Sequence, residues 1–181
     1  MPPFVKEEQS VSRRLLVAVG AMAITLTVVI TTAAAAPPRM FVTPLSGAEE
    51  MPVRQTHGRG VAIFQLSPDG TELSYRLIAS NIENVIAAHI HIGAPAVNGP
   101  VVAFLYGAVA PGGGRQNGVL ATGTITAGDL VGPLQGMPFD DLVDAIASGN
   151  AYVNVHTNDG TDPTNTGAGD FPGGEIRGQL D

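Results

Sequence analysis

Residues 87–93 read AAHIHIG, a segment in which imidazole and aliphatic side chains alternate. Successive side chains of a β-strand point to opposite faces, so His89 and His91 are expected to share one face. Ile90 and Ile92 would then share the other face and enter the core. The segment predicts a strand with one polar side and one apolar side, and an all-β fold follows if the rest of the chain behaves alike.

Similar short runs of apolar and β-branched residues recur along the chain, separated by Gly, Pro, Asn and Asp. They predict strands at residues 40–43, 60–66, 72–79, 87–92, 101–105, 119–126, 151–156 and 175–180. Residues 67–70 (SPDG) form a turn signal, because Pro presets φ and Gly accepts the left-handed conformation. The predicted fold is an antiparallel Greek-key β-sandwich or flattened barrel of about eight strands.

One helix interrupts this pattern. Residues 140–148 (DDLVDAIAS) place Leu142 and Ile146 on one face, with acidic residues in the first turn and Gly149 as the terminating residue. Two glycine-rich stretches, 107–118 and 158–174, are expected to be loops. The second is long enough to suggest a functional role or a disordered tip.

The first 36 residues have the pattern of a secretory signal. Basic residues precede an uncharged apolar run at 15–30, and four alanines end it at position 36. The same run is long enough to serve as an uncleaved membrane anchor. Arg13 and Arg14 leave open whether export is by the general or the twin-arginine route. We therefore expect a signal peptide at 1–36, a domain at 37–181 and membrane attachment only through an uncleaved N-terminal segment.

Composition excludes several functions. The chain has no Cys, which rules out disulfides, thiolate metal sites and cysteine nucleophiles. Residues 37–181 contain six Arg, no Lys and 14 Asp or Glu, a formal charge of −8. This is unfavourable for binding nucleic acid or anionic lipid. No nucleophile elbow or phosphate-binding loop is present, so the sequence offers no recognisable catalytic motif.

A third histidine lies on a comparable predicted strand. In residues 151–157 (AYVNVHT), alternation places Tyr152, Asn154 and His156 on one face. Imidazole is a good ligand for copper and zinc, and three histidines with an open position form a site of catalytic type. His89, His91 and His156 are therefore candidate metal ligands, with copper as the candidate cofactor. The alternative is that they only form structural hydrogen bonds.

Arg177 is the other polar residue with a candidate role. In the last predicted strand, Glu175, Arg177 and Gln179 share a face. Arg177 could form a surface or intra-sheet ion pair with Glu175, or lie beside the histidines and guide an anion to them.

Several of these segments together resemble the CHRD domain, the module repeated in chordin. The similar pieces are residues 45–50, 88–95, 98–102, 149–157 and 171–180, in this order. The resemblance covers roughly residues 40–181. His57 lies outside the similar pieces and receives no role from them.

The resemblance implies an extracytoplasmic β-domain. In chordin such domains accompany cysteine-rich modules that bind bone morphogenetic proteins, and that activity does not transfer because this chain has no such module. The first functional expectation is thus a non-catalytic, secreted or cell-surface module that contacts a protein or matrix partner.

A second likeness concerns layout. Copper/zinc superoxide dismutase is also a β-sandwich with a His-x-His strand, a later copper-ligand histidine and an arginine near the copper. The order His89, His91, His156, Arg177 is similar, but the bridging histidine, the zinc loop and the disulfide have no counterparts here. The alternative expectation is a copper-binding redox domain that uses these histidines.

Overall fold

The computed structural model describes residues 39–181; the predicted signal peptide lies outside the described residues. The strands are β1 (Met40–Ser46), β2 (Arg59–Leu66), β3 (Leu73–Glu83), β4 (Val85–Ile92), β5 (Val101–Gly107), β6 (Arg115–Ile125), β7 (Ala151–Thr157) and β8 (Ile176–Leu180). A single α-helix, α1 (Phe139–Ala147), is found among the described residues. Short 3-10 turns cover Gly47–Glu49, Ala127–Asp129 and Gly132–Leu134.

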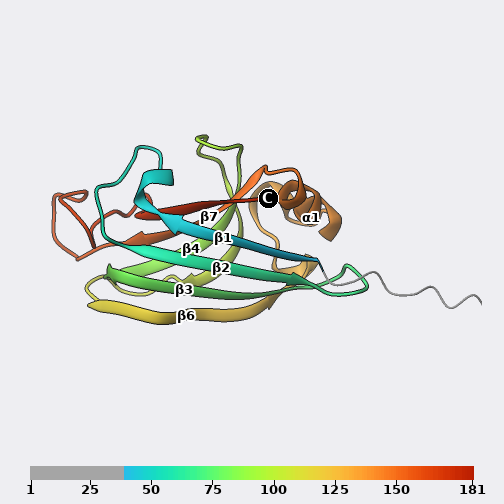
Figure 1. The fold of residues 1–181 in the computed structure, drawn as a ribbon, viewed down its shortest axis with the longest axis horizontal. Coiled ribbons are helices and arrows are strands. Elements are labelled where there is room, and N and C mark those ends of the chain that lie inside the picture. Colours follow the sequence, from blue (N-terminus) through green and yellow to red (C-terminus); the bar gives the residue numbers. More distant parts are fainter. Residues whose placement is uncertain (1–38) are drawn as a thin grey trace, which may run out of the picture. The chain divides into compact units, whose positions relative to one another are not determined.

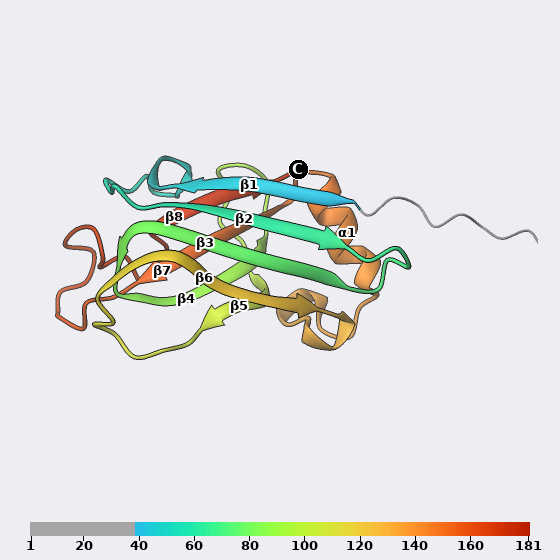
Figure 2. The ribbon, with the colours of Figure 1, turned by 60° about the horizontal axis from the view of Figure 1, so that its bottom comes forward.

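All eight strands belong to one antiparallel sheet, in the order β5-β4-β7-β8-β1-β2-β3-β6. The sheet curls so that β4 and β7 lie behind β1, β2 and β3 (Figures 1 and 2). Its two edge strands, β5 and β6, approach each other, and the Tyr75 hydroxyl on β3 donates a hydrogen bond to Leu105 O on β5, at 2.8 Å. The fold is therefore the flattened, nearly closed barrel that the sequence predicts.

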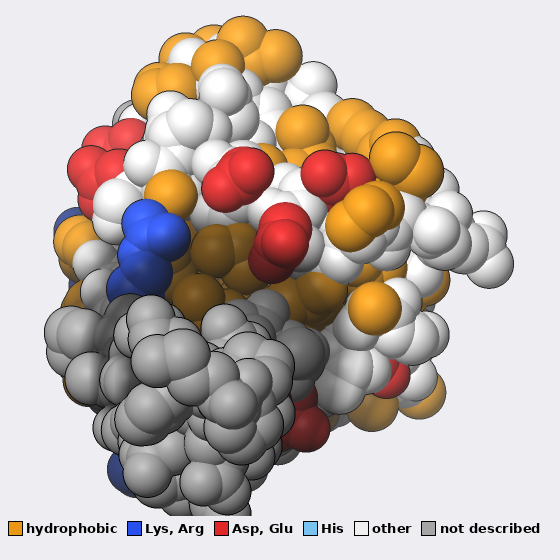
Figure 3. Space-filling view, turned by 90° about the vertical axis from the view of Figure 1, so that its right-hand side faces the viewer, with side chains coloured by type: hydrophobic (Ala, Val, Ile, Leu, Met, Phe, Trp, Pro, Cys, Tyr) orange, Lys and Arg blue, Asp and Glu red, His pale blue; other side chains and the backbone are white. Residues whose placement is uncertain are grey.

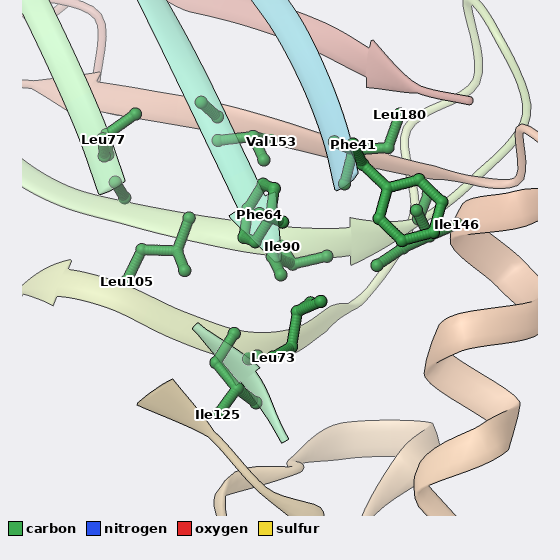
Figure 4. Close-up of a cluster of buried hydrophobic side chains, with 14 of the residues drawn as sticks. Phe41, Phe64, Leu73, Leu77, Ile90, Leu105, Ile125, Ile146, Val153 and Leu180 are labelled. Atoms are coloured by element: carbon green, nitrogen blue, oxygen red, sulfur yellow. The ribbon is translucent and has the colours of Figure 1, made fainter. Parts of the chain in front are cut away.

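Alternating side chains fill the interior of this barrel. Phe64 on β2, Ile90 on β4 and Val153 on β7 are at most 1% exposed and face the same cluster (Figure 4). Burial of such side chains contributes about 1.5–3 kcal/mol each before entropy is subtracted. The prediction that Ile90 enters the core is confirmed, and the histidines beside it lie on the outer side of the sheet.

Helix α1 closes one end of the barrel. Its apolar face buries Phe139, Leu142, Val143 and Ile146, and Ile146 lies near Phe41 (Figure 4). Asp140 and Asp141 occupy its first turn, and Gly149 follows it with φ +70°. The predicted helix, its acidic start and its glycine stop are confirmed.

Several strands extend beyond their predicted ends, and β3 and β6 do so the furthest. β3 continues to Glu83 and β6 begins at Arg115, because the two strands resume pairing beyond an irregularity between Ala79 and Ile82. Residues 115–118 are polar or glycine, so no local apolar pattern marks them as a strand. The 67–70 turn forms as predicted, with Gly70 at φ +75° and its N–H donated to Ser67 O.

The end of the barrel seen in Figure 3 carries several acidic side chains among hydrophobic ones.

Within residues 39–181 no helix has both the length and the apolar character needed to cross a bilayer.

Candidate metal centre

The three histidines lie on two adjacent strands. β4 pairs with β7 so that His91 faces Tyr152 and His89 faces Asn154 across the ladder. His156 pairs with Ala87, two residues along β4 from His89, so the two rings are diagonal neighbours on the same face. The alternation inferred from residues 87–93 and 151–157 thus brings all three imidazoles to one place.

The separations between these rings suit a shared ligand. Ring nitrogens of the three histidines, one from each, all lie within 4.8 Å of one another. His89 Nδ1 is 3.1 Å from His156 Nε2. Metal–nitrogen bonds of about 2.0–2.1 Å put two ligand nitrogens roughly 3–4 Å apart, so the cluster needs only a small contraction to close on an ion.

Backbone carbonyls orient two of the rings. His91 Nδ1 lies 2.8 Å from Gly99 O, and His156 Nδ1 lies 2.8 Å from Pro172 O. A carbonyl oxygen only accepts, so each Nδ1 carries the proton and each Nε2 keeps its lone pair. This is the arrangement by which proteins fix the tautomer of a metal-binding histidine.

The cluster also has an internal hydrogen bond. Since His156 Nε2 is an acceptor, His89 Nδ1 donates its proton to it. That bond is the structural alternative expected from sequence. It does not account for His91 Nε2, which is buried beside the Asn154 side chain without a hydrogen bond of normal geometry. A buried acceptor without a partner costs about 1–3 kcal/mol, and here it belongs to the ring that points its other nitrogen at Gly99.

Burial keeps all three rings neutral. His91 is 8% and His156 9% exposed, and His89 is half-buried. Burial, with smaller effects of His156 and His91, lowers the pKa of His89 from 6.5 to about 4. Burial also lowers the pKa of His91 and of His156, although the hydrogen bonds to Gly99 and Pro172 oppose it. Neutral imidazole is the form that binds metals, so the cluster is ready for a metal ion at neutral pH.

A layered stack supports His91 from behind. The Tyr152 ring lies parallel to the His91 ring, with an interplanar angle of 9° and centroids 4.8 Å apart. The Arg177 guanidinium carbon lies 3.4 Å from the Tyr152 centroid. Because β4 and β8 flank β7, Tyr152 lies between the imidazole and the guanidinium. The Tyr152 hydroxyl accepts the Gly99 N–H, so Gly99 contacts both rings of the stack.

Arg177 is buried, with 1% exposure, and its guanidinium donates to Asn98 Oδ1, Ala94 O, Val97 O and Gln179 Oε1. The arginine thereby holds the loop after β4 against the sheet. The expected ion pair with Glu175, at the surface or within the sheet, is wrong: Glu175 is also fully buried and accepts hydrogen bonds from Thr56, Thr157 and Gly169 instead. The role of Arg177 as an anion guide stays a prediction.

The position of Pro172 depends on the end of the long loop. Thr157 N–H donates to Phe171 O, and Phe171 N–H donates back to the Thr157 hydroxyl at 2.9 Å. The Glu175 carboxylate in turn accepts the Thr157 hydroxyl. The 158–174 segment, expected to be a functional loop or a disordered tip, thus supplies the carbonyl that orients His156.

Sequence reasoning missed Glu50. This residue is 3% exposed, and burial raises its pKa to about 7 in spite of the nearby Arg177 and Arg54. Its Oε1 and the Oδ1 of Asn154 are both buried without hydrogen-bond partners. No periodic pattern marks Glu50, because it lies just after a short 3-10 turn and is buried only by the tertiary fold.

His57, the fourth histidine, lies elsewhere. It is exposed and lines a pocket of about 560 Å³. That pocket is open and formed mainly by exposed side chains. The other lining residues include Arg59, Asn81, Glu83 and Arg115. We place the candidate site at the histidine cluster, because the donor atoms converge there and an unpartnered buried nitrogen points to a ligand.

The family comparison covers this whole structure. The model of the CHRD domain matches residues 41–180, from the first strand to the last. No curated protein sequence and no solved structure gives a significant match to the chain. The match includes all three clustered histidines, Tyr152 and Arg177. The chain therefore belongs to the CHRD domain family.

Proposed function

We propose that this protein is an exported CHRD module that binds a copper ion through His89, His91 and His156. The observation that carries the proposal is the convergence of three neutral imidazoles, two of them held by Nδ1–H bonds to carbonyls, within 4.8 Å. His91 and His156 would bind through Nε2. His89 would bind through Nδ1 after its proton moves to Nε2, which exchanges its hydrogen bond to His156 for a metal bond.

Copper is the preferred ion on chemical grounds. Imidazole suits both copper and zinc, and copper stands above zinc in the general order of divalent affinities. The cluster contains no carboxylate, the oxygen donor on which calcium and magnesium sites chiefly depend.

We propose that the protein binds the ion without using it in a reaction. The Arg177 guanidinium, which lies against the stack, donates its hydrogen bonds to the loop after β4 and to Gln179 rather than to the cluster. The redox alternative draws its support from His89, whose partial exposure would give a small molecule access to the ion. Consumption of superoxide by the copper-loaded protein, lost in His91→Ala, would favour that alternative.

We also propose that the protein is exported and that it contacts a protein or matrix partner. The pattern of residues 1–36 and the extracytoplasmic character of the family both support a secreted or cell-surface location. Exposed Met51, Val53 and Val97, on loops joined by a hydrogen bond from Asn98 to Met51 O, support contact with a protein or matrix partner. Sequencing the N-terminus of the exported protein tests the first point, and an intact Met1 would contradict cleavage.

Copper titration of the purified protein, with thermal unfolding as the measurement, tests the site. An ion bound only by the native state raises the melting temperature, and about 3 kcal/mol is gained when its concentration is a hundred times the Kd. We expect this gain in the wild type and in His57→Gln, the matched control, and its loss in His91→Ala. Equal copper binding by His91→Ala and the wild type would contradict the proposal.

A further inference from the structure

We propose that the histidine cluster selects monovalent copper over divalent ions, and that the stack of Arg177 and Tyr152 behind His91 is part of that selection. This inference rests on the proposed function, because it names the oxidation state of the ion that the three imidazoles hold. It is argued from the donor set, the burial of the cluster and the charges around it.

The donor set provides no negative charge. All three candidate ligands are neutral imidazoles, and the hydrogen-bond partners of His91 and His156 are neutral carbonyls. In many metal sites a carboxylate accepts the second N–H of a histidine and makes the ligand more basic. Here that contribution is missing, so the bound ion would keep nearly its full charge.

The cluster is also poorly hydrated. His91 and His156 are less than a tenth exposed, and only His89 is half-buried. The cost of moving an ion out of water grows with the square of its charge, so an uncompensated divalent ion pays roughly four times the cost of a monovalent one. A site of this kind favours the ion of lower charge.

The permanent charge of Arg177 strengthens the preference for an ion of lower charge. The Arg177 guanidinium lies against one face of Tyr152, and His91 lies against the other. Repulsion between this cation and the bound ion doubles when the ion carries two charges instead of one. Glu50 interacts electrostatically with this guanidinium, and its carboxylate opposes the repulsion when it is ionised.

The number of ligands agrees with this choice. Three nitrogen ligands complete the coordination of monovalent copper, whereas a zinc ion held by three histidines must take a fourth ligand, such as water, into this poorly hydrated cluster. The cluster brings together three ring nitrogens and no other His, Asp or Glu donor within the described part of the chain. The Tyr152 hydroxyl accepts a hydrogen bond from Gly99 N–H.

The test compares affinities on the purified protein. Cu⁺ affinity is measured without oxygen by competition with a coloured Cu⁺ chelator, and Zn²⁺ affinity by competition with a zinc dye. We expect Cu⁺ to bind at least 100-fold more tightly than Zn²⁺. Equal or tighter Zn²⁺ binding, lost in His91→Ala, would overturn the selection while leaving a metal site in place. Absence of any histidine-dependent copper binding would instead overturn the proposed function.

Two variants test the role of the surrounding charges. Arg177→Met should narrow the ratio of the two affinities about tenfold, whereas Arg177→Lys, which keeps the charge, should change it less. If Arg177→Met does not fold, Glu50→Gln answers the same question. At pH 8 it removes the anion that offsets Arg177 and should widen the ratio several-fold. An unchanged ratio in Glu50→Gln would overturn the role assigned to the cation.

Discussion

The two faces of strands β4, β7 and β8 differ in what holds them together. The inner face presents Ile90, Val153 and Ile176 to a dry core, where close packing is the stabilising interaction. The outer face of the same strands presents His91, Tyr152 and Arg177, which are also buried but carry polar groups. A buried residue on these strands therefore need not belong to the hydrophobic core, because loops cover the outer face, and hydrogen bonds and stacking hold it together.

The largest expected change in stability comes from a substitution on the inner face. Ile90→Ala removes a side chain with 0% exposure and should lower the free energy of unfolding by about 2–5 kcal/mol. Urea denaturation measures the loss. The neighbouring variant His89→Ala, on the outer face, is the control and should cost less than half as much while abolishing copper binding. Similar losses in the two variants would mean that the faces do not differ as described.

A smaller effect, of opposite sign, is expected from the outer face. Glu50 has a folded pKa of about 7, above its value of 4.5 in the unfolded chain, because it is buried. The folded state therefore binds the proton more tightly, and the stability that this provides is complete below pH 4.5 and lost as pH rises to about 7.

Glu50→Gln should abolish this loss. At pH 8 the variant should be more stable than the wild type by about 1–3 kcal/mol, with the two converging near pH 4.5. Thermal unfolding across this range measures the difference. A variant that is less stable at pH 8 would show that the carboxylate is stabilised by Arg177 rather than penalised by burial.

Acid should weaken the protein through His89. Its folded pKa of about 4 lies below the unfolded value of 6.5, so the unfolded state binds the proton more tightly. The stability associated with the neutral ring is complete above pH 6.5 and lost as pH falls through 4. We expect a loss of about 1–2 kcal/mol, discounted for the partial exposure of the ring.

The variant His89→Asn isolates this contribution. Its unfolding free energy, measured by urea denaturation between pH 7 and 4, should fall by about 1–2 kcal/mol less than that of the wild type. His57→Gln, at an exposed position, should follow the wild type. Identical pH profiles for His89→Asn and the wild type would contradict the assignment.

The smallest effect concerns the rim of the cluster. Phe104 on β5 is 53% exposed and packs edge-on against His89, with ring centroids 4.9 Å apart. Phe104→Ala should change stability by about 0.5 kcal/mol or less, as expected for a surface position. It should weaken copper binding a few-fold, because the His89 ring loses a contact that orients it. A change of more than tenfold would place Phe104 among the residues that form the site.

The sequence by itself determined most of each strand, the helix and the shared face of His89 and His91, because strand and helix periods are local properties of the chain. It also determined which residues were candidate metal ligands, since the alternation of side chains in 87–93 and 151–157 can be inferred from the sequence without knowledge of the fold. Only the tertiary structure decided that β4 lies beside β7, that Tyr152 separates His91 from Arg177, and that Glu50 is buried. These depend on contacts between segments far apart in the chain, and no local pattern encodes a distance between them.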